Sequence, residues 1–231
     1  MLDMGQVKNK TASALPGGHS RNHRNVLFIL PQAMIVMLDT PQDLTVCAAE
    51  LGCEVEQLFT PLTRRNPQQP ERMFAMDNGA FARFEAKGFL AMLAKHEPRK
   101  DLCRFVAVPD VVGCARRTLE CFRHWQPRLV KWPVAFVCQD GQENLDLPWE
   151  NCAAVFIGGS TEWKMGKHAA AIVKASKVIG KWCHVGRINT PGRLEYFQEL
   201  GADSCDGTGL AQYSHMRKAI FEERNNPRLN I

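Results

Sequence analysis

The stretch Ser204-Cys205-Asp206-Gly207-Thr208-Gly209 follows a short run with apolar flanks and precedes a segment of helical character. This order predicts a β-strand that ends at Asp206 and is followed directly by a helix. The two glycines carry no Cβ, so a ligand could approach the backbone beside the carboxylate. Asp206 is therefore a candidate nucleophile at the C-terminal end of a strand.

Three earlier apolar runs stop in the same way, at Asp77, Asp110 and Gln139. Strands are expected at residues 26–30, 54–59, 73–76, 104–108, 132–137, 153–157, 181–185 and 202–205. Short apolar strands that alternate with helices predict a parallel sheet covered on both faces. Their number predicts an α/β fold of the compact (β/α)8 TIM-barrel type, with a doubly wound open sheet as the alternative. The Gly-x-Gly-x-x-Gly fingerprint of dinucleotide-binding folds does not follow any of these strands.

Helices are expected at residues 40–51, 82–96, 113–126, 161–178, 190–201 and 209–224. Thr40 would be the N-cap of the first helix and Pro41 its first residue. Residues 1–24 are polar and basic and predict a flexible tail. The remainder, residues 25–231, is expected to form a single barrel domain.

The composition is that of an ordinary globular protein, with 45% hydrophobic and 23% charged residues. No apolar run approaches the roughly 20 residues of a membrane span, so no membrane association is expected. The nine cysteines form no Cys-x-x-Cys pair. Buried free thiols in a reducing compartment are expected, which predicts a cytoplasmic protein, in the host if a phage encodes it. The net charge of +5 is compatible with a polyanionic partner.

In a β/α barrel the C-terminal ends of the strands form one face, and active sites are built there. Three carboxylates on one rim repel one another, which is costly unless the protein uses them. For each aspartate alone, a helix N-cap is the alternative. Two carboxylates beside a glycosidic bond can divide displacement chemistry, because one attacks the sugar while the other transfers a proton. A third carboxylate and an amide can read a purine edge.

The strand ends carry an ordered set of motifs. They are Asp77-Asn-Gly-Ala-Phe81, Val108-Pro-Asp110, Val137-Cys-Gln139-Asp-Gly141, Phe156-Ile-Gly-Gly159, Val185-Gly186-Arg-Ile-Asn-Thr-Pro191 and Ala202-Asp-Ser-Cys-Asp206. In order and spacing, this set resembles the tRNA-guanine transglycosylase superfamily. Within it, the set is most similar to the phage and bacterial enzymes that put 7-deazaguanines into DNA. The resemblance covers residues 73–210.

The resemblance implies that Asp206 forms a covalent bond to the sugar C1′ after guanine leaves, and that Asp77 is the general acid/base. Asp110 and Gln139 would recognise the edge of guanine or of a 7-deazaguanine such as preQ0. The other residues implied to contact the base are Gly158 and Gly159 through their backbone, Gly186, and Phe81 and Met165 over its faces. No cofactor is implied.

Two departures from the family pattern bear on the substrate. Ala80 stands where the family has a second glycine in its Asp-Ser-Gly-Gly-Phe stretch. The tRNA enzymes carry a Cys-x-Cys-x-x-Cys and His zinc module after the nucleophile, and no such cluster follows Asp206 here. These departures favour DNA over tRNA as the substrate and argue against a metal.

A polynucleotide substrate needs basic residues near the pocket. Candidates for holding phosphates are Arg64, Arg65, Arg187 and Arg193, in or near the strand-end loops. Two further basic groups fall in and after expected helices: Arg116, Arg117, Arg123, Arg128 and Lys131, and Lys164, Lys167, Lys174, Lys177 and Lys181. Solvated helix faces are the alternative for both groups. Trp163 is a candidate for base stacking, whereas His184 is expected to be structural.

Three other functions stay open at this point. The same pocket would serve tRNA-guanine exchange, or a base-releasing N-glycosidase in which water resolves the sugar intermediate. A non-catalytic nucleic-acid-binding barrel is the third, although it gives the strand-end aspartates no role. DNA and a 7-deazaguanine base are the expected partners, and a homodimer or partner modification proteins stay open.

Overall fold

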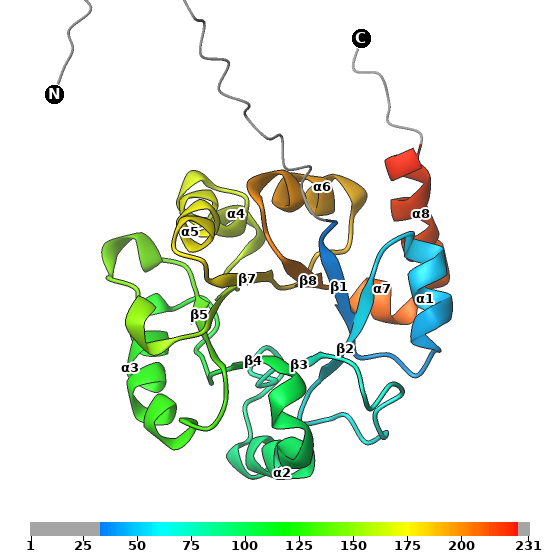
Figure 1. Ribbon diagram of the computed structural model, residues 1–231. Coiled ribbons are helices and arrows are strands. Elements are labelled where there is room, and N and C mark those ends of the chain that lie inside the picture. Colours follow the sequence, from blue (N-terminus) through cyan, green and yellow to red (C-terminus); the bar gives the residue numbers. More distant parts are fainter. Residues whose placement is uncertain (1–32, 226–231) are drawn as a thin grey trace, which may run out of the picture. The chain divides into compact units, whose positions relative to one another are not determined.

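The computed structural model describes residues 33–225. Eight parallel strands pair in chain order and close into a barrel, which confirms the predicted (β/α)8 TIM-barrel fold (Figure 1). The strands are β1 Ile35–Leu38, β2 Val55–Phe59, β3 Phe74–Met76, β4 Cys103–Ala107, β5 Val134–Cys138, β6 Ala154–Ile157, β7 Trp182–Val185 and β8 Ser204–Asp206. The described residues belong to one compact unit, residues 31–231.

The barrel closes where β1 pairs with β8, with Val36 opposite Cys205 and Met37 opposite Asp206. The strand β1 was not predicted from the sequence. The first strand was expected at residues 26–30, which lie outside the described residues, as does the predicted tail. All four residues of β1 are apolar and buried.

Helices surround the ring of strands (Figure 1). They are α1 Leu44–Leu51, α2 Ala86–His96, α3 Ala115–Trp125, α4 Thr161–Lys164, α5 Lys167–Val178, α6 Pro191–Leu200, α7 Thr208–Gln212 and α8 Ser214–Asn225. Short 3-10 helices lie at Glu97–Leu102, Gln126–Arg128, Gln142–Asn144 and Trp149–Asn151. No helix in this part of the chain has the length and apolarity needed to cross a bilayer.

The start of α1 corrects a prediction. The helix begins at Leu44 rather than at Pro41, because Asp43 is its N-cap and accepts hydrogen bonds from the N–H groups of Thr45 and Val46. An aspartate cap satisfies two N–H groups that Thr40 was too far upstream to reach. The two long helices predicted around Met165 and Tyr213 are each split into a short and a long helix.

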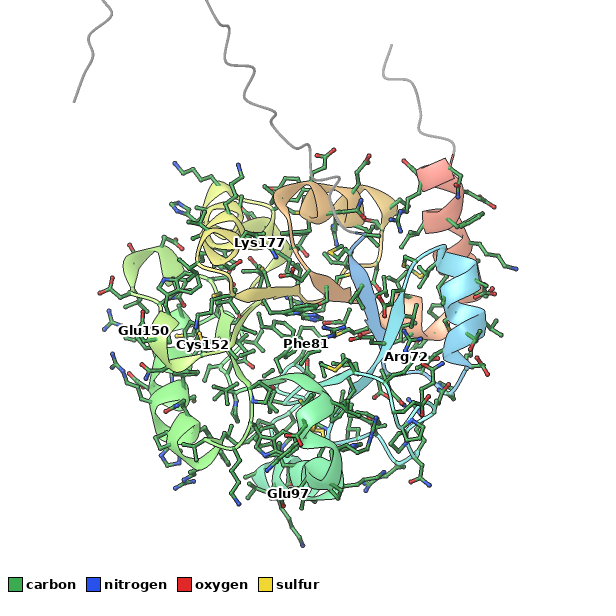
Figure 2. All side chains as sticks on the ribbon, in the orientation of Figure 1. Arg72, Phe81, Glu97, Glu150, Cys152 and Lys177 are labelled. Atoms are coloured by element: carbon green, nitrogen blue, oxygen red, sulfur yellow. The ribbon has the colours of Figure 1, made fainter. Side chains whose placement is uncertain are left out.

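Side chains alternate between two apolar layers along each strand. One layer packs between the strands and the helices. The other fills the barrel interior with Ile35, Met37, Leu58, Ala75, Phe105, Ala107, Ala135, Val137, Ala154 and Phe156. Figure 2 shows these side chains in the same view, with Phe81 labelled over the middle of the ring.

The barrel interior also contains a buried ion pair. Glu56 on β2 is 2% exposed, and Arg104 on β4 donates to both of its carboxylate oxygens at 2.5 Å. Both residues lie near the starts of their strands, at the end of the barrel opposite the strand C-termini. The guanidinium of Arg104 also lies over the ring of Trp182, 4.5 Å from its centroid.

All nine cysteines are free thiols, and six of them are buried. Burial raises the pKa of Cys103 and of Cys183 to about 12, so both stay protonated at neutral pH. This agrees with the prediction of buried free thiols.

Candidate active site

A cavity of about 450 Å³ opens at the C-terminal ends of the strands. Its lining includes every residue that the family resemblance implies for the chemistry or for contact with the base, with one exception. These residues are Asp77, Phe81, Asp110, Gln139, Gly158, Gly159, Gly186 and Asp206, and Arg187 joins them. Met165 is the exception, since it packs against the core beside the cavity. Strand ends far apart in the sequence therefore meet in one pocket.

Asp77 directly follows β3. Hydrogen bonds hold both its backbone N–H group and its side-chain carboxyl group. Its N–H donates to the carbonyl of Phe59 at 2.8 Å, and its Oδ1 accepts from the N–H of Gly79 at 2.6 Å. Burial, followed by the negative charge of Asp206, raises the pKa of Asp77 to about 7. A carboxyl group with this pKa can donate or accept a proton near neutral pH.

Asp206 is the last residue of β8, and both of its carboxylate oxygens are engaged. Oδ1 accepts from the backbone N–H of Arg187 at 3.1 Å, and Oδ2 lies 3.0 Å from Nε2 of His184. The prediction that His184 only supports the fold overlooked this contact. The sequence contained a clue to this contact in the alternation of side chains along β7. His184 lies two residues before Gly186, so its side chain is on the same side of the strand as position 186.

Arg187 connects two walls of the cavity. It is the single non-glycine residue with positive φ in the described chain, at 61°. Its guanidinium lies over the ring of Phe81, 4.6 Å from the centroid, and donates to the carbonyl of Gly159. A left-handed arginine costs backbone energy, and such strain concentrates at functional sites.

Lys164 is buried behind this segment, 3% exposed, and its ammonium donates to the carbonyl of Gly186. Burial, and then the charge of Arg187, lowers the pKa of Lys164 to about 8. From the sequence, Lys164 was one of five lysines expected in and after a helix, with a solvated helix face as the alternative. Two other members of that group are also engaged, since Lys177 pairs with Asp203 and Lys181 donates to the carbonyl of Cys152.

Asp110 is oriented by two side-chain amides. Asn78 donates to its Oδ1 at 2.8 Å, and Gln139 donates to its Oδ2 at 2.6 Å. Burial raises the pKa of Asp110, and these two hydrogen bonds oppose the shift. The carboxyl oxygens that face the cavity therefore offer acceptors in a fixed direction.

Gln139 is largely engaged within the protein. Its Oε1 accepts from the N–H groups of Gly113 and Gly159, both at 2.9 Å. The N–H of Gly158 donates to the carbonyl of Cys138 at 2.9 Å. Both N–H groups thus have partners within the protein, so the predicted contact of these two backbones with the base would have to displace one of these hydrogen bonds if it used an N–H group.

Tight packing explains these two glycines. A Cβ at Gly158 would lie 2.7 Å from Nε2 of Gln139. Gly159 has a φ of 70°, and a Cβ there would lie 2.6 Å from the ring of Trp163. Trp163 itself does not line the cavity, and its Nε1 donates to Glu143 at 2.9 Å.

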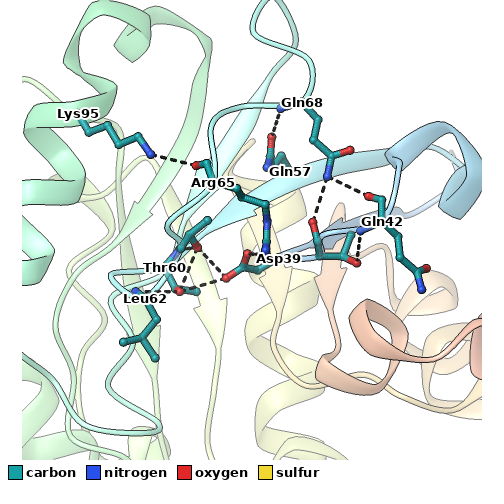
Figure 3. A network of polar contacts seen from close by, with 10 residues as sticks. Asp39, Gln42, Gln57, Thr60, Leu62, Arg65, Gln68 and Lys95 are labelled. Atoms are coloured by element: carbon teal, nitrogen blue, oxygen red, sulfur yellow. Dashed lines mark hydrogen bonds and ion pairs between the residues drawn. The ribbon is translucent and has the colours of Figure 1, made fainter.

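Three of the four predicted phosphate-binding arginines lie outside the cavity lining. Arg64 is exposed and Arg193 is half-buried on α6. Arg65 pairs with Asp39, whose other oxygen accepts from Thr60 and Thr63 (Figure 3).

Gln68 continues this network toward α1. Its side-chain Nε2 donates to the carbonyls of Thr40 and Gln42 at 3.0 and 2.9 Å. Together with the Asp39 contacts, these bonds fix the loop that follows β2 against the rim of the barrel (Figure 3). Arg65 is therefore tied to the loop, and of the four arginines Arg187 is the one in the pocket.

No protein-family model matches the chain, and no curated protein sequence matches it. Among solved structures, the chain is similar to one from a BexX/CysO complex of Amycolatopsis orientalis, with 15% identity over 87% of this chain and 94% of that one, and a TM-score of 0.52. A native KDPGal structure matches with 13% identity, 83% and 94% coverage and a TM-score of 0.42. A flavocytochrome b2 mutant matches with 9% identity, 83% and 62% coverage and a TM-score of 0.48. At 15% identity, the likeness to the chain from the BexX/CysO complex shows a shared fold only.

Proposed function

We propose that this protein exchanges guanine in DNA for a 7-deazaguanine base through a covalent aspartyl–sugar intermediate. The observation that carries the proposal is the pairing of Asp206 with Asp77 in one cavity. Asp206 is held by two hydrogen bonds, and the pKa of Asp77 is raised to about 7. Enzymes that cleave glycosidic bonds commonly use two carboxyl groups. Different surroundings make one of them the nucleophile and the other the general acid/base.

In the first half of the proposed reaction, a carboxylate oxygen of Asp206 attacks the sugar C1′. The C1′–N9 bond breaks, and Asp77 gives its proton to the leaving guanine. An ester bond now joins Asp206 to the sugar, and Asp77 is ionised. Its raised pKa supports this step, because about half of the Asp77 side chains carry a proton at pH 7.

In the second half, the ionised Asp77 takes the N9 proton of the incoming base. N9 then attacks C1′, the ester bond breaks, and the carboxylate of Asp206 is restored. The two hydrogen bonds to Asp206 support this step, because they stabilise the leaving carboxylate. Asp77 ends the cycle protonated, so protons and bonds balance.

Recognition of the base is assigned to Asp110. Its oxygens accept hydrogen bonds and are held in place by Asn78 and Gln139. A guanine-like edge presents N–H donors at N1 and N2, which match such acceptors, whereas adenine presents an acceptor at N1. Gln139 then acts mainly by positioning Asp110. Phe81, which is 68% exposed at the mouth of the pocket, supplies an aromatic face for stacking.

The charges on the rim support a polyanionic substrate. The first turns of α2, α3, α5 and α6 contain no acidic residue. Basic residues stand there instead, namely Lys87, Arg116, Arg117, Lys167 and Arg193. A cation at a helix N-terminus opposes the helix dipole, and none of these five forms an ion pair with a described residue. A phosphate backbone across this face would compensate them.

Release of labelled guanine from DNA tests the proposal. Purified protein is mixed with DNA that carries radiolabelled guanine, and unlabelled preQ0 is added. We expect release that depends on preQ0 and is abolished in Asp206→Asn. A variant of a rim-distant surface residue, Arg72→Ala, is the matched control and should release label as the wild type does.

Other results would redirect the proposal. Release without preQ0 would identify a base-releasing glycosidase, and release from tRNA but not from DNA would change the substrate. Salt-sensitive DNA binding that survives loss of Asp77, Asp110 and Asp206, with no release, would indicate a binding protein. Full activity in Asp206→Asn would remove the covalent mechanism.

A further inference from the structure

We propose that His184 is a positioning residue for Asp206, fixed in a single tautomer by a chain of hydrogen bonds through the barrel interior. The proposal rests on the function proposed above for Asp206. It assigns a role to a side chain that lies outside the cavity lining and that the reaction scheme does not otherwise use.

The chain joins four residues of β7 and β8. Nε1 of Trp182 donates to Oγ of Ser204 at 2.9 Å. Oγ of Ser204 lies 2.8 Å from Nδ1 of His184, and Nε2 of His184 lies 3.0 Å from Oδ2 of Asp206. An indole N–H only donates, and an ionised carboxylate only accepts. Trp182 is therefore the donor at one end of the chain and Asp206 the acceptor at the other. These two ends fix the donor and the acceptor of each hydrogen bond between them.

The tautomer of His184 follows from this constraint. Nε2 must carry the hydrogen, because Asp206 accepts it. Oγ of Ser204 already accepts from Trp182, so its hydroxyl hydrogen is free to donate to Nδ1. Nδ1 then acts as the acceptor, and every polar atom in the chain has a partner. A second proton on Nδ1 would displace the hydroxyl hydrogen, for which no other acceptor is present among the described residues.

The packing leaves the His184 ring little freedom to rotate. It is fully buried and lies between Phe105 and Phe156, with ring centroids 4.9 and 4.6 Å away. A carboxylate that is bonded to such a ring keeps one orientation.

Trp182, at the start of the chain, is fixed in turn. The guanidinium of Arg104 covers its ring, and the carboxylate of Glu56 accepts from Nε and Nη2 of that guanidinium. A continuous polar path thus connects the ion pair at one end of the barrel with Asp206 at the other. The middle of this path, at Ser204 and His184, is fully buried, and a low local dielectric strengthens hydrogen bonds there.

Loss of the His184 side chain should lower the rate of base exchange and leave the binding of the base nearly unchanged. His184 does not line the cavity, so its loss should leave the KM for preQ0 within about threefold of the wild-type value. Loss of a hydrogen bond to a charged group should lower kcat by about tenfold to a hundredfold in His184→Leu. His184→Gln, whose amide can donate to Oδ2, should recover at least about tenfold of the loss.

His96→Leu provides the matched control. His96 is also a buried histidine packed against two aromatic rings, Phe59 and Phe74, but it lies outside the barrel interior. Its replacement should leave kcat unchanged, because His96 does not line the cavity and has no contact with Asp206. Equal kcat for His184→Leu and the wild type, or no recovery in His184→Gln when both variants are folded, would overturn the proposal.

Nitrogen-15 NMR of the histidine rings separates this proposal from the proposed activity, because it needs no turnover. We expect a hydrogen on Nε2 and none on Nδ1 of His184, with the Nε2 signal shifting in Asp206→Ala and the Nδ1 signal shifting in Ser204→Ala. The opposite tautomer would overturn the proposal even in an active enzyme. A wild-type protein that exchanges no base but shows the expected signals would refute the proposed function and leave the tautomer assignment standing.

Discussion

The guanidinium of Arg187 stacks on the ring of Phe81, with its Cζ 4.6 Å from the ring centroid. The two residues follow different strands, β7 and β3, so the stack spans the mouth of the cavity. Meanwhile the backbone N–H of Arg187 contacts Asp206. Arg187 thus serves the site in two ways, one through its side chain and one through its main chain.

Arg187→Gly separates these two contributions. Glycine adopts the positive φ of this position without strain, so the backbone contact with Asp206 should persist although the side-chain contacts with Phe81 and Gly159 are lost. We expect weaker DNA binding, by about three- to tenfold, and a salt dependence reduced by roughly one phosphate contact. Binding measured over a series of salt concentrations checks this, with Arg72→Ala as the control. An unchanged salt dependence would contradict it.

The pKa of Asp77 sets the pH dependence of guanine release. Release requires a protonated Asp77, and the pKa is raised to about 7. Single-turnover release should therefore fall about tenfold for each pH unit above 7. Incorporation of the incoming base requires the ionised form and should fall below pH 7. Rapid-quench measurements of each half-reaction would test this, and a flat profile for release between pH 6 and 9 would contradict it.

The same pKa makes Asp77 a source of instability. Below pH 4 the carboxyl is protonated in both the folded and the unfolded state, so it costs nothing. Between pH 4 and 7 the unfolded state releases its proton while the folded state keeps it, so stability is lost until pH 7 and stays lost above it. Asp77→Asn should therefore be more stable than the wild type by a few kcal/mol at pH 8 and by much less at pH 4. Urea unfolding at the two pH values measures the difference, and an equal gain at both would refute the linkage.

The ion pair in the barrel interior should be costly to break. Arg104→Leu would leave Glu56 buried and unpaired, which typically costs about 3–5 kcal/mol. The control is Arg72→Leu, because Arg72 pairs with Glu54 on the surface, with both side chains nearly half exposed. Loss of such a pair costs about 0–1 kcal/mol. Equal melting temperatures for the two variants would show that Glu56 finds another partner or water.

The sequence predicted the barrel and most strand ends because apolar runs and the residues that stop them are local signals. The alternation of strands and helices was enough to place Asp77, Asp110 and Asp206 on one face. It was not enough to find β1, because this four-residue strand is defined by its pairing with β2 and β8 and such pairing is not a local signal.

Side-chain partners were also beyond the sequence. Lys164 reads as one of a series of surface lysines, and only the packing of α4 against the end of β7 shows that it is buried. From the sequence, Gln139 was expected to bind the ligand. In the structure its Oε1 accepts hydrogen bonds from the N–H groups of Gly113 and Gly159 in neighbouring loops. Each of these contacts joins residues at least twenty positions apart, where no local pattern records them.

The register of β8 between β1 and β7 has a consequence for biosynthesis. The strand that carries Asp206 is the last of the eight to leave the ribosome, and it pairs with the first. Until it docks, the growing sheet has two open edges, each of which can capture another chain. Partly made chains therefore lack both the carboxylate and the closed wall that orients it, and under the proposed function the nascent protein is inert toward DNA until the ring is complete.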